Sequence, residues 1–303
     1  MIVLNDSFKV KLKYKTYVTI GSFDGLHKGH LSLINKAVEL SKKSNVKSMV
    51  NTFKEHPLNT INKNIAPKLI MDNETKIQLL EDYGIDILNL SNFIDIMKIS
   101  PEDYILNMIK YYNIEGIITG FNHKFGYKNE GDVKLLQNLS EKYGFELYVV
   151  DPIKVDGEIV SSTSIRKYIT DGKIAKANEM LLRPFSLKGT VIHGRQVGRT
   201  LGFPTANLKY DNNFVVPGIG VYYTVVEYNG KKYKAITDVG YAPTVRDSDF
   251  TIESYMLNFN ENIYEKSIKV NFIEKIRNEV KFNNIDELKK QLENDKKFAE
   301  SKD

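Results

Sequence analysis

The chain has 303 residues, of which 42% are apolar and 27% charged, and its formal net charge is +5. This composition is typical of a globular protein and excludes a disordered tail, a collagen or a coiled coil, and the length favours two domains. The lack of cysteine excludes disulfides, thiolate-bound metals and a cysteine nucleophile. With no secretory leader, no apolar run of membrane-spanning length and a small net charge, we expect a soluble cytoplasmic protein that binds neither membranes nor nucleic acids.

The first half alternates short β-rich runs with segments of helical spacing. Strands are predicted at 17–20, 46–53, 85–90, 116–119 and 145–151, and helices at 30–44, 73–84, 101–112 and 132–144. This alternation predicts a parallel sheet with helices on both faces, a doubly wound α/β domain. Two short helical stretches follow, and we place the boundary after them, giving domains 1–182 and 183–303.

From about residue 185 the pattern becomes β-rich, with runs separated by Gly, Asn or Pro. Strands are predicted at 186–193, 220–229, 231–240, 250–259 and 266–273. Asn229 and Gly230 predict a tight hairpin between two of them. The second domain is therefore expected to be an antiparallel barrel or sandwich. An amphipathic helix at 284–302 closes the chain, and its Ile285, Leu288 and Leu292 form an apolar stripe that is predicted to cover the barrel.

The segment GSFDGLHKGH (21–30) follows the first predicted strand and opens the first helix. Its glycines allow a ligand to approach the backbone closely. His27 and His30 fall on one side of the first helical turn, where free N–H groups and the positive end of the helix dipole attract phosphates. Two imidazoles there can donate hydrogen bonds to a polyphosphate in a transition state. The alternative is a glycine-rich turn with a capping Asp and two surface histidines.

The whole segment resembles the HxGH nucleotidyltransferase superfamily and, more narrowly, the adenylyltransferase module of bacterial bifunctional riboflavin kinase/FAD synthetases. Three further strings resemble motifs of that module in the same order, namely TFKEHP (52–57), GFNHKFG (120–126) and SSTSIR (161–166). Taken alone, the serines of the last string are explained by capping of a helix N-terminus.

The resemblance implies adenylyl transfer from ATP to FMN, which yields FAD and pyrophosphate. It implies that His27 and His30 stabilise the phosphates and that Asn122 contacts the flavin. The remaining implied residues shape the nucleotide pocket or hold the leaving pyrophosphate: Gly21, Phe23, Asp24 and Gly29 for the pocket, and Ser162, Thr163 and Arg166 for the pyrophosphate. Asn122 and His123 replace the family's Asp-Phe pair, which motivates an alternative, a riboflavin kinase with a weakened or altered adenylyltransferase domain.

A second glycine-rich segment, HGRQVGRTLGFPTANL (193–208), can wrap phosphates through its backbone N–H groups. Thr205 and Asn207 are two residues apart on extended chain and therefore point the same way. Such an uncharged pair can hold Mg²⁺ when nucleotide phosphates supply the negative oxygens. The alternative is an ordinary Gly/Pro turn between two barrel strands.

The string from Gly189 to Asn207, continued by VPGIGVYY, VGYAPTV, TIESYMLNF and IRNEVKF, resembles riboflavin kinase, whose fold is a six-stranded antiparallel barrel. The resemblance implies that Thr205 and Asn207 bind Mg²⁺–ATP and that Glu253 is the base for the riboflavin 5′-hydroxyl. It further implies nucleotide contacts and one flavin contact: Gly194, Arg199 and Gly202 for the nucleotide, and Arg277 for the flavin. Three positions depart from the family's usual residues: Asp238 for Asn, Asn258 for Asp, and Glu265 for Gly.

We therefore expect a bifunctional enzyme that uses Mg²⁺ and ATP to convert riboflavin to FMN and then FMN to FAD. A rival of another class is a flavin- or nucleotide-binding regulator without turnover, against which the intact Glu253, Thr205 and Asn207 argue. A metal site built from the five histidines is disfavoured, because none has a nearby carboxylate in a zincin-like pattern.

Overall fold

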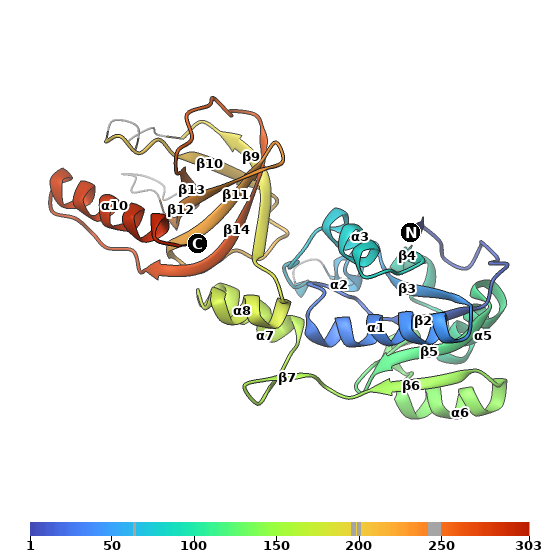
Figure 1. Ribbon diagram of the computed structural model, residues 1–303. Helices are drawn as coiled ribbons and strands as arrows, with labels where there is room; N and C mark the ends of the chain where they lie inside the picture. Colours follow the sequence, from blue (N-terminus) through green and yellow to red (C-terminus); the bar gives the residue numbers. More distant parts are fainter. Residues whose placement is uncertain (63–64, 195–197, 199–200, 242–249, 303) are drawn as a thin grey trace. The chain divides into compact units, whose positions relative to one another are not determined.

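The computed structural model describes residues 1–302 apart from 63–64, 195–197, 199–200 and 242–249. Its contacts divide the chain into two compact units, Met1–Ser162 and Thr163–Asp303 (Figure 1). This division groups almost all of α7 (Ser162–Thr170) and all of α8 (Ile174–Leu181) with the second unit. The boundary expected at 182–183 stays a prediction.

The first unit is built on a six-stranded, wholly parallel sheet with the order β1–β4–β3–β2–β5–β6. The strands are β1 (Ile2–Leu4), β2 (Thr16–Ile20), β3 (Lys47–Phe53), β4 (Ile87–Ser91), β5 (Ile114–Gly120) and β6 (Glu146–Val150). The helices are α1 (Lys28–Lys43), α2 (Pro57–Ile61), α3 (Asn73–Asp82), α4 (Phe93–Ile96), α5 (Pro101–Tyr112) and α6 (Val133–Tyr143), and a small ribbon of β7 (Lys154–Val155) and β8 (Glu158–Ile159) follows.

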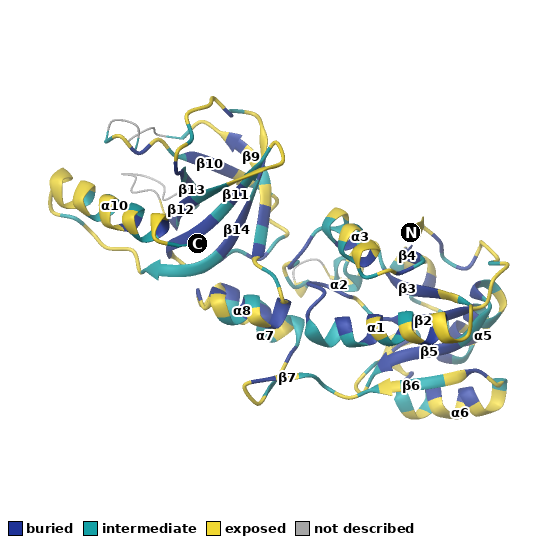
Figure 2. Ribbon diagram, in the orientation of Figure 1, coloured by how far each residue is buried: buried dark blue, intermediate teal, exposed yellow. Residues whose placement is uncertain are grey.

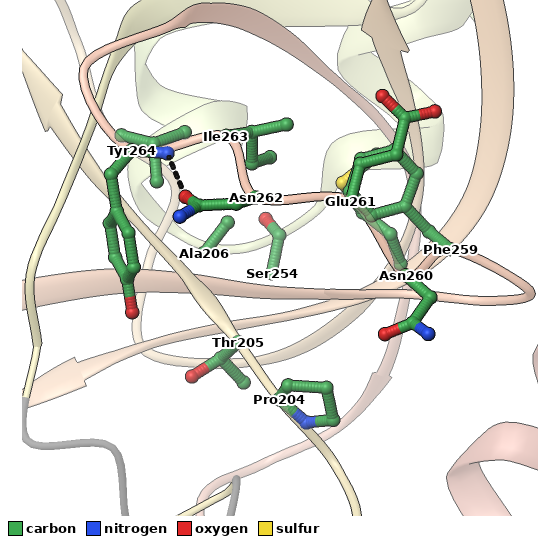
Figure 3. A pocket seen from close by; sticks show the side chains of 12 residues that line it. Pro204, Thr205, Ala206, Ser254, Phe259, Asn260, Glu261, Asn262, Ile263 and Tyr264 are labelled. Carbon is green, nitrogen blue, oxygen red and sulfur yellow. Dashed lines mark hydrogen bonds between the residues drawn. The ribbon is translucent and has the colours of Figure 1, made fainter.

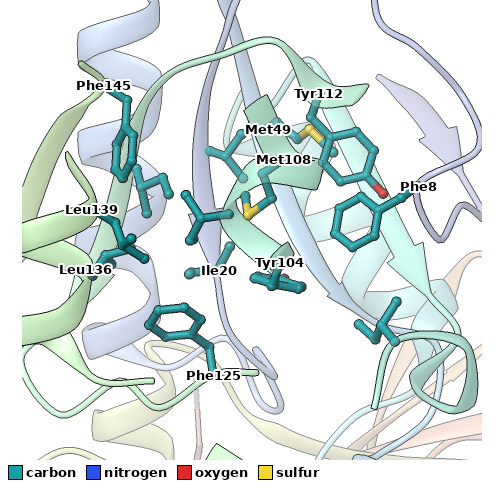
Figure 4. Packing of buried hydrophobic residues seen from close by; sticks show 14 of the residues in the cluster. Phe8, Ile20, Met49, Tyr104, Met108, Tyr112, Phe125, Leu136, Leu139 and Phe145 are labelled. Carbon is teal, nitrogen blue, oxygen red and sulfur yellow. The ribbon is translucent and has the colours of Figure 1, made fainter. Parts of the chain in front are cut away.

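Helices cover both faces of this sheet, as two separate apolar clusters show. On one face, side chains of α5 and α6 such as Tyr104, Met108 and Leu136 pack against the strands (Figure 4). On the other face, α1 and α3 contribute residues such as Ile34 and Leu80 to a second cluster. Because both faces are covered, β2 and β4 are buried at every position instead of alternating (Figure 2). The doubly wound α/β prediction is confirmed.

The strand order reverses at β2, which defines the ligand-binding edge of the sheet. From β2 the chain adds β3 and then β4 on one side, and it returns to place β5 and β6 on the other. Ligands of open α/β sheets bind outside the carboxyl ends of the strands at such a reversal. The segment 21–30 follows β2 and the segment 120–126 follows the end of β5, so two of the predicted motifs lie at this point.

The second unit contains a closed antiparallel barrel with the order β10–β13–β12–β11–β14–β9, which confirms the six-stranded prediction. The strands are β9 (Phe185–Ile192), β10 (Ala206–Tyr210), β11 (Gly220–Tyr228), β12 (Lys231–Tyr241), β13 (Phe250–Met256) and β14 (Ser267–Arg277). Asn229 and Gly230 have φ angles of 48° and 73°, so the hairpin between β11 and β12 turns as the sequence predicts.

The final helix, α10 (Ile285–Glu300), rests on the barrel through its second half. Ala299 is fully buried and joins a cluster with Val221 and Ile236 of the strands. The predicted apolar stripe is wrong at its first member, because Ile285 is 67% exposed. The reason lies in the anchoring of the helix, whose buried Asp295 is held by Arg277 at the end of β14.

Candidate active sites

The loop that follows β2 is held in one conformation by contacts from four directions. The Ser22 carbonyl accepts hydrogen bonds from Thr52 Oγ1 at 2.9 Å and from Lys76 Nζ at 3.4 Å. The Asp24 carboxylate accepts from the Ile70 backbone N–H at 3.0 Å, and its carbonyl accepts from Ser162 Oγ at 2.9 Å. These tethers fix a backbone that would otherwise be strained.

The strain itself is visible in the backbone angles of this loop. Phe23 and Leu26 have φ angles of 47° and 40°, in the left-handed region that non-glycine residues avoid, and Gly25 has 86°. Both non-glycine side chains are fully buried. Strain of this kind persists only where the surroundings impose it, and it is concentrated at ligand sites. Phe23 and Asp24 therefore shape the loop from its buried side, behind the predicted nucleotide pocket.

The two histidines of the loop stand together at the start of α1. Their rings stack with centroids 3.6 Å apart and an interplanar angle of 17°. His27 is the N-cap of the helix, and its Nδ1 accepts from the His30 backbone N–H at 3.3 Å. A neutral imidazole that accepts at Nδ1 carries its proton on Nε2, which can then donate to a ligand. Phe23 meets the His30 ring edge-on at 5.1 Å and steadies it.

The glycine between these histidines has a steric reason. A Cβ on Gly29 would lie 3.3 Å from the His27 ring, and one on Gly21 would lie 3.3 Å from the Phe23 ring. Side chains at either position would press on the rings that the loop orients. The first turn of α1 carries no acidic residue, so the positive end of the helix dipole favours an anion.

Sequence reasoning missed Lys76, which lies on α3 and is 6% exposed. Burial lowers the pKa of its ammonium, and the nearby Asp24 acts in the opposite direction. A buried cation is costly unless it is partnered, so its presence under this loop indicates a positioning role. The signal available in the sequence was its spacing, because Lys76 and the buried Leu80 are four residues apart on one helix face.

Residues 120–126 carry Asn122, whose predicted flavin contact remains a prediction. Asn122 is exposed. His123 instead turns inward and stacks on Phe125 at 5.9 Å. Thr163 and Arg166 follow Ser162 along α7 and are counted with the second unit, so their predicted phosphate contacts remain predictions.

In the barrel, three predicted residues come together from β13, from β10 and from the residue just before β10. Thr205 Oγ1 donates a 3.0 Å hydrogen bond to Glu253 Oε2, although the residues are 48 positions apart. Asn207 on β10 lies directly opposite Glu253 on β13. Directly paired residues of an antiparallel sheet project to the same side. The two predicted Mg²⁺ ligands and the predicted base thus lie next to one another on the barrel, in a group that we call the Thr205–Glu253 edge.

The glycine-rich segment before β10 is only partly described. Gly194 lies so close to Asn207 that any Cβ would collide with the amide. Gly202 has a φ of 86° and open space around it, so it supplies a turn that other residues resist. Arg199 lies outside the described residues, and its predicted nucleotide contact remains a prediction.

A cavity of about 380 Å³ opens beside Thr205. Figure 3 shows Pro204 and Thr205 on one side of it and the segment 259–264 on the other. The lining combines apolar groups with the amides of Asn260 and Asn262, and His193 stacks on Tyr264 at its rim with centroids 3.7 Å apart. The mixture of an aromatic wall and a few polar groups is typical of a small-molecule site.

Arg277 is placed differently from its predicted role. Its guanidinium makes three hydrogen bonds of 2.8–3.2 Å to the carboxylate of Asp295, whose side chain is 1% exposed. The pairing anchors α10 to the barrel, and the flavin contact remains a prediction.

The sequence matches two families, one in each half of the chain. Residues 9–164 match the family described as FAD synthetase, and residues 181–302 match riboflavin kinase. A bifunctional riboflavin kinase/FMN adenylyltransferase of Bacillus subtilis is 34% identical over 94% of this chain and 92% of its own length. The chain belongs to the bifunctional riboflavin kinase/FMN adenylyltransferase family. The Escherichia coli K12 member is 33% identical over 93% of this chain and 91% of its own length.

A solved structure with the same fold carries a different description. A crystal structure described as a macrolide-efflux protein from Streptococcus pneumoniae is 29% identical and superimposes with a TM-score of 0.88, covering 100% of this chain and 99% of that one. In the described part of the present chain, no helix is long and apolar enough to cross a bilayer. The likeness shows that this solved structure shares the fold of the present chain over its length.

Proposed function

We propose that the chain phosphorylates riboflavin in its barrel and adenylylates FMN at the edge of its parallel sheet, with ATP as co-substrate of both steps. The observation that carries the proposal lies in the half that matches riboflavin kinase: Thr205, just before β10, donates a hydrogen bond to Glu253 on β13, and Asn207 on β10 is paired with Glu253. The stacked His27 and His30 at the start of α1 support the second step.

In the kinase step, Glu253 accepts the proton of the riboflavin 5′-hydroxyl. The freed oxygen forms a bond to the γ-phosphorus of ATP, and the bond from that phosphorus to the β–γ bridging oxygen breaks, which releases ADP. Such a transfer depends on positioning and on charge stabilisation, since the protein forms no covalent bond. Thr205 lines the cavity and also contacts Glu253, so ATP bound in the cavity would present its phosphates to the base.

The donors at this edge fit a magnesium ion. Thr205 and Asn207 offer uncharged oxygens, and Glu253 supplies one carboxylate beside them. Mg²⁺ prefers oxygen ligands and is commonly bound by one or two carboxylates together with substrate phosphates and water. Thr205 and Asn207 would hold the ion, which when bound neutralises charge on the ATP phosphates.

In the adenylyl step, an oxygen of the FMN phosphate forms a bond to the α-phosphorus of ATP while the bond to the pyrophosphate breaks. His27 and His30 donate hydrogen bonds to the charged oxygens, and the positive end of the α1 dipole attracts the same charge. Ser162, Thr163 and Arg166 would receive the leaving pyrophosphate at the start of α7, and Asn122 would contact the flavin.

The alternative of a weakened adenylyltransferase rests on Asn122 and His123. Burial lowers the pKa of His123 to about 4, so its ring is neutral at neutral pH and can serve as a flat aromatic surface. Its stacking on Phe125 supports this substitute role. We therefore favour two working sites over a kinase with an idle partner.

Two variants test the assignment, each as the control for the other. Glu253→Gln removes the proton acceptor, so FMN formation from riboflavin should fall by about 10²–10⁴-fold while FAD formation from supplied FMN persists. His30→Ala should lower FAD formation by roughly 10²-fold and spare FMN formation. Chromatographic separation of the flavins reports both activities in one assay with ATP and Mg²⁺.

A third variant tests whether removal of any glutamate charge from a barrel strand would lower the activity. Glu227→Gln changes a glutamate of β11 that is paired with Lys269 and lies outside the Thr205–Glu253 edge. It should retain both activities. Wild-type rates of FMN formation in Glu253→Gln would exclude Glu253 as the base, and loss of both activities in a folded His30→Ala protein would exclude two separate sites.

A further inference from the structure

Asp238 is the side chain that extends the row of kinase residues toward α10. It lies on β12 directly opposite Glu253, just as Asn207 lies opposite Glu253 on the other flank. Ile236 and Tyr255 stand two residues from Asp238 and Glu253 along their strands, so they share a side with them. Ile236 belongs to the apolar cluster that contains Ala299 of α10, and Tyr255 packs against that cluster. The row Asn207–Glu253–Asp238 therefore runs over the outside of the barrel on the α10 side.

The Asp238 carboxylate lacks the hydrogen-bond donor that its burial calls for. Its Oδ1 is shielded from solvent, and no residue in the described part of the chain donates a hydrogen bond to it. The residue as a whole is partly exposed. A buried acceptor left without a donor is costly, and a hydroxyl donor from a ligand would complete it.

The charges around Asp238 define the chemistry of that ligand. The groups that face it are Glu253 on β13, Glu279 after β14, Asp295 on α10 and Arg277 on β14. Arg277 is the single cation among these four, and its guanidinium is occupied by Asp295. Burial, followed by Glu279 and Glu253, raises the pKa of Asp238 to about 6, which leaves it mainly ionised at neutral pH. An anion would be repelled here, whereas a neutral chain of hydroxyl donors would be held.

We propose that Asp238 binds the secondary hydroxyls of the riboflavin side chain and so sets the register of the 5′-hydroxyl against Glu253. The proposal rests on the kinase activity proposed above. Directly opposed residues of an antiparallel pair have Cβ atoms about 4.5–5.5 Å apart, so two adjacent carboxylates can engage neighbouring hydroxyls of one polyol chain. Asp238 accepts from the inner hydroxyl, and Glu253 accepts from the terminal one that reacts.

The test crosses two enzymes with two substrates. The substrates are riboflavin and the flavin whose side chain is 5-hydroxypentyl, which keeps the reacting hydroxyl and lacks the secondary ones. In the wild type, loss of these hydroxyls should lower kcat/KM for phosphorylation by about 10- to 100-fold, the range for a hydrogen bond to a charged group. Asp238→Ala should lower kcat/KM for riboflavin by a similar factor and show little further loss with the analogue.

Additional variants separate recognition from folding. Asp238→Asn keeps an acceptor oxygen and should retain more activity with riboflavin than Asp238→Ala does, and the KM for ATP should not change in either. Asp211→Asn, at an exposed turn after β10, serves as the control and should behave as the wild type. FAD formation from supplied FMN, which uses the other unit, checks that each protein is intact.

The outcomes distinguish this proposal from the function on which it rests. A wild type that phosphorylates neither substrate overturns the proposed kinase. If the wild type phosphorylates riboflavin, the proposed kinase activity holds. If removal of the hydroxyls then lowers kcat/KM by the same factor in the wild type and in Asp238→Ala, the role of Asp238 is overturned.

Discussion

His123 stands after β5 where the family's pattern has phenylalanine, and its ring lies parallel to that of Phe125 with an interplanar angle of 8°. Its Nε2 is shielded from solvent without a hydrogen-bond partner among the described residues. Burial lowers the pKa of the imidazole to about 4, well below its ordinary value of 6.5. The folded protein therefore resists protonation of this ring, whereas the unfolded chain accepts the proton.

The buried neutral His123 makes the folded protein less stable at acidic pH. Between pH 6.5 and 4 the unfolded state binds the additional proton, so the free energy of unfolding falls as the pH falls through this window. His123→Phe removes the effect. We expect equal stabilities at pH 7.5 and an advantage of about 2 kcal/mol for the phenylalanine variant at pH 5, measured by urea unfolding. Parallel pH profiles of the two proteins would contradict the buried neutral state. FAD formation at pH 7.5 should change by no more than a few-fold.

Glu265 shows a second departure, this time with a backbone cost. It follows the cavity segment with a φ of 63°, and its N–H donates to the Val191 carbonyl at 2.8 Å. The left-handed conformation costs a non-glycine residue roughly 1 kcal/mol. Glu265→Gly should therefore leave the free energy of unfolding unchanged or raise it by up to about 1 kcal/mol, the gain being offset by the flexibility of unfolded glycine.

A matched glycine substitution provides the contrast. Glu274→Gly places glycine inside β14, where the backbone is extended, and should lower the free energy of unfolding by about 1 kcal/mol. Urea unfolding midpoints of the two variants measure the difference. Equal destabilisation by both would mean that the conformation at Glu265 carries no strain.

Local strings in the sequence predict His27, His30, Thr205 and Glu253 as site residues, and the structure places the first two at the start of α1 and the last two within hydrogen-bond distance of each other. The same strings cannot show what lies beside them in space. The pairing of Asp238 with Glu253 depends on the register of β12 against β13, and the position of Lys76 under the β2 loop depends on how α3 packs. Both are tertiary choices that periodicity leaves open.

At the scale of elements, α10 is anchored to the barrel by a buried ion pair as well as by apolar contacts of its last turn. Asp295 is almost fully buried, and removing one partner of a buried pair leaves the other charge uncompensated. Asp295→Ala should lower the free energy of unfolding by about 3 kcal/mol. Asp286→Ala, in the exposed first turn of the same helix, should cost less than about 1 kcal/mol. Comparable losses in the two variants, measured by thermal unfolding, would contradict the anchoring role.

A double variant separates this anchoring role from the flavin contact predicted for Arg277. Replacing the pair with apolar residues of similar volume, Arg277→Met with Asp295→Leu, is often neutral for stability. If Arg277 also binds flavin, this variant should regain stability while its KM for riboflavin stays raised. A normal KM in the stable double variant would leave Arg277 with the structural role alone.

Secondary structure in this chain was predictable where an element carries its own signal. The helices α1, α5 and α6 show clear spacing and caps, and Asn229-Gly230 specifies its hairpin. The strand β1 has three residues at a sheet edge, and β10 follows a glycine-rich loop, so neither has a periodic run of its own. For α10 the amphipathic pattern is real, but periodicity cannot tell which half of a helix meets the barrel.

At the scale of the whole molecule, the segment between the two family matches packs as part of the barrel unit. Asn178 on α8 donates to the carbonyls of Phe272 and Ile273 on β14 and accepts from the backbone N–H of Phe185 on β9. The Gly218 N–H before β11 donates to the carbonyl of Ile169 on α7. Buried apolar residues of the two helices accompany these bonds: Ile165, Ile169, Ile174, Ala177, Met180 and Leu181.

This packing predicts where the kinase can be separated from the rest of the chain. A fragment of residues 163–303 keeps both helices, whereas a fragment of 183–303, cut at the boundary expected from the sequence, loses them and exposes the strands that they cover. Burial of each large aliphatic side chain contributes about 1.5–3 kcal/mol, and a domain has only about 5–15 kcal/mol in total. We expect the longer fragment to fold and convert riboflavin to FMN without making FAD, and the shorter one to be less stable by about 4 kcal/mol or more. Urea unfolding of both fragments, with the full chain as reference, measures the difference. Equal stability of the two fragments would mean that the folded barrel domain begins at β9 and does not need α7 and α8.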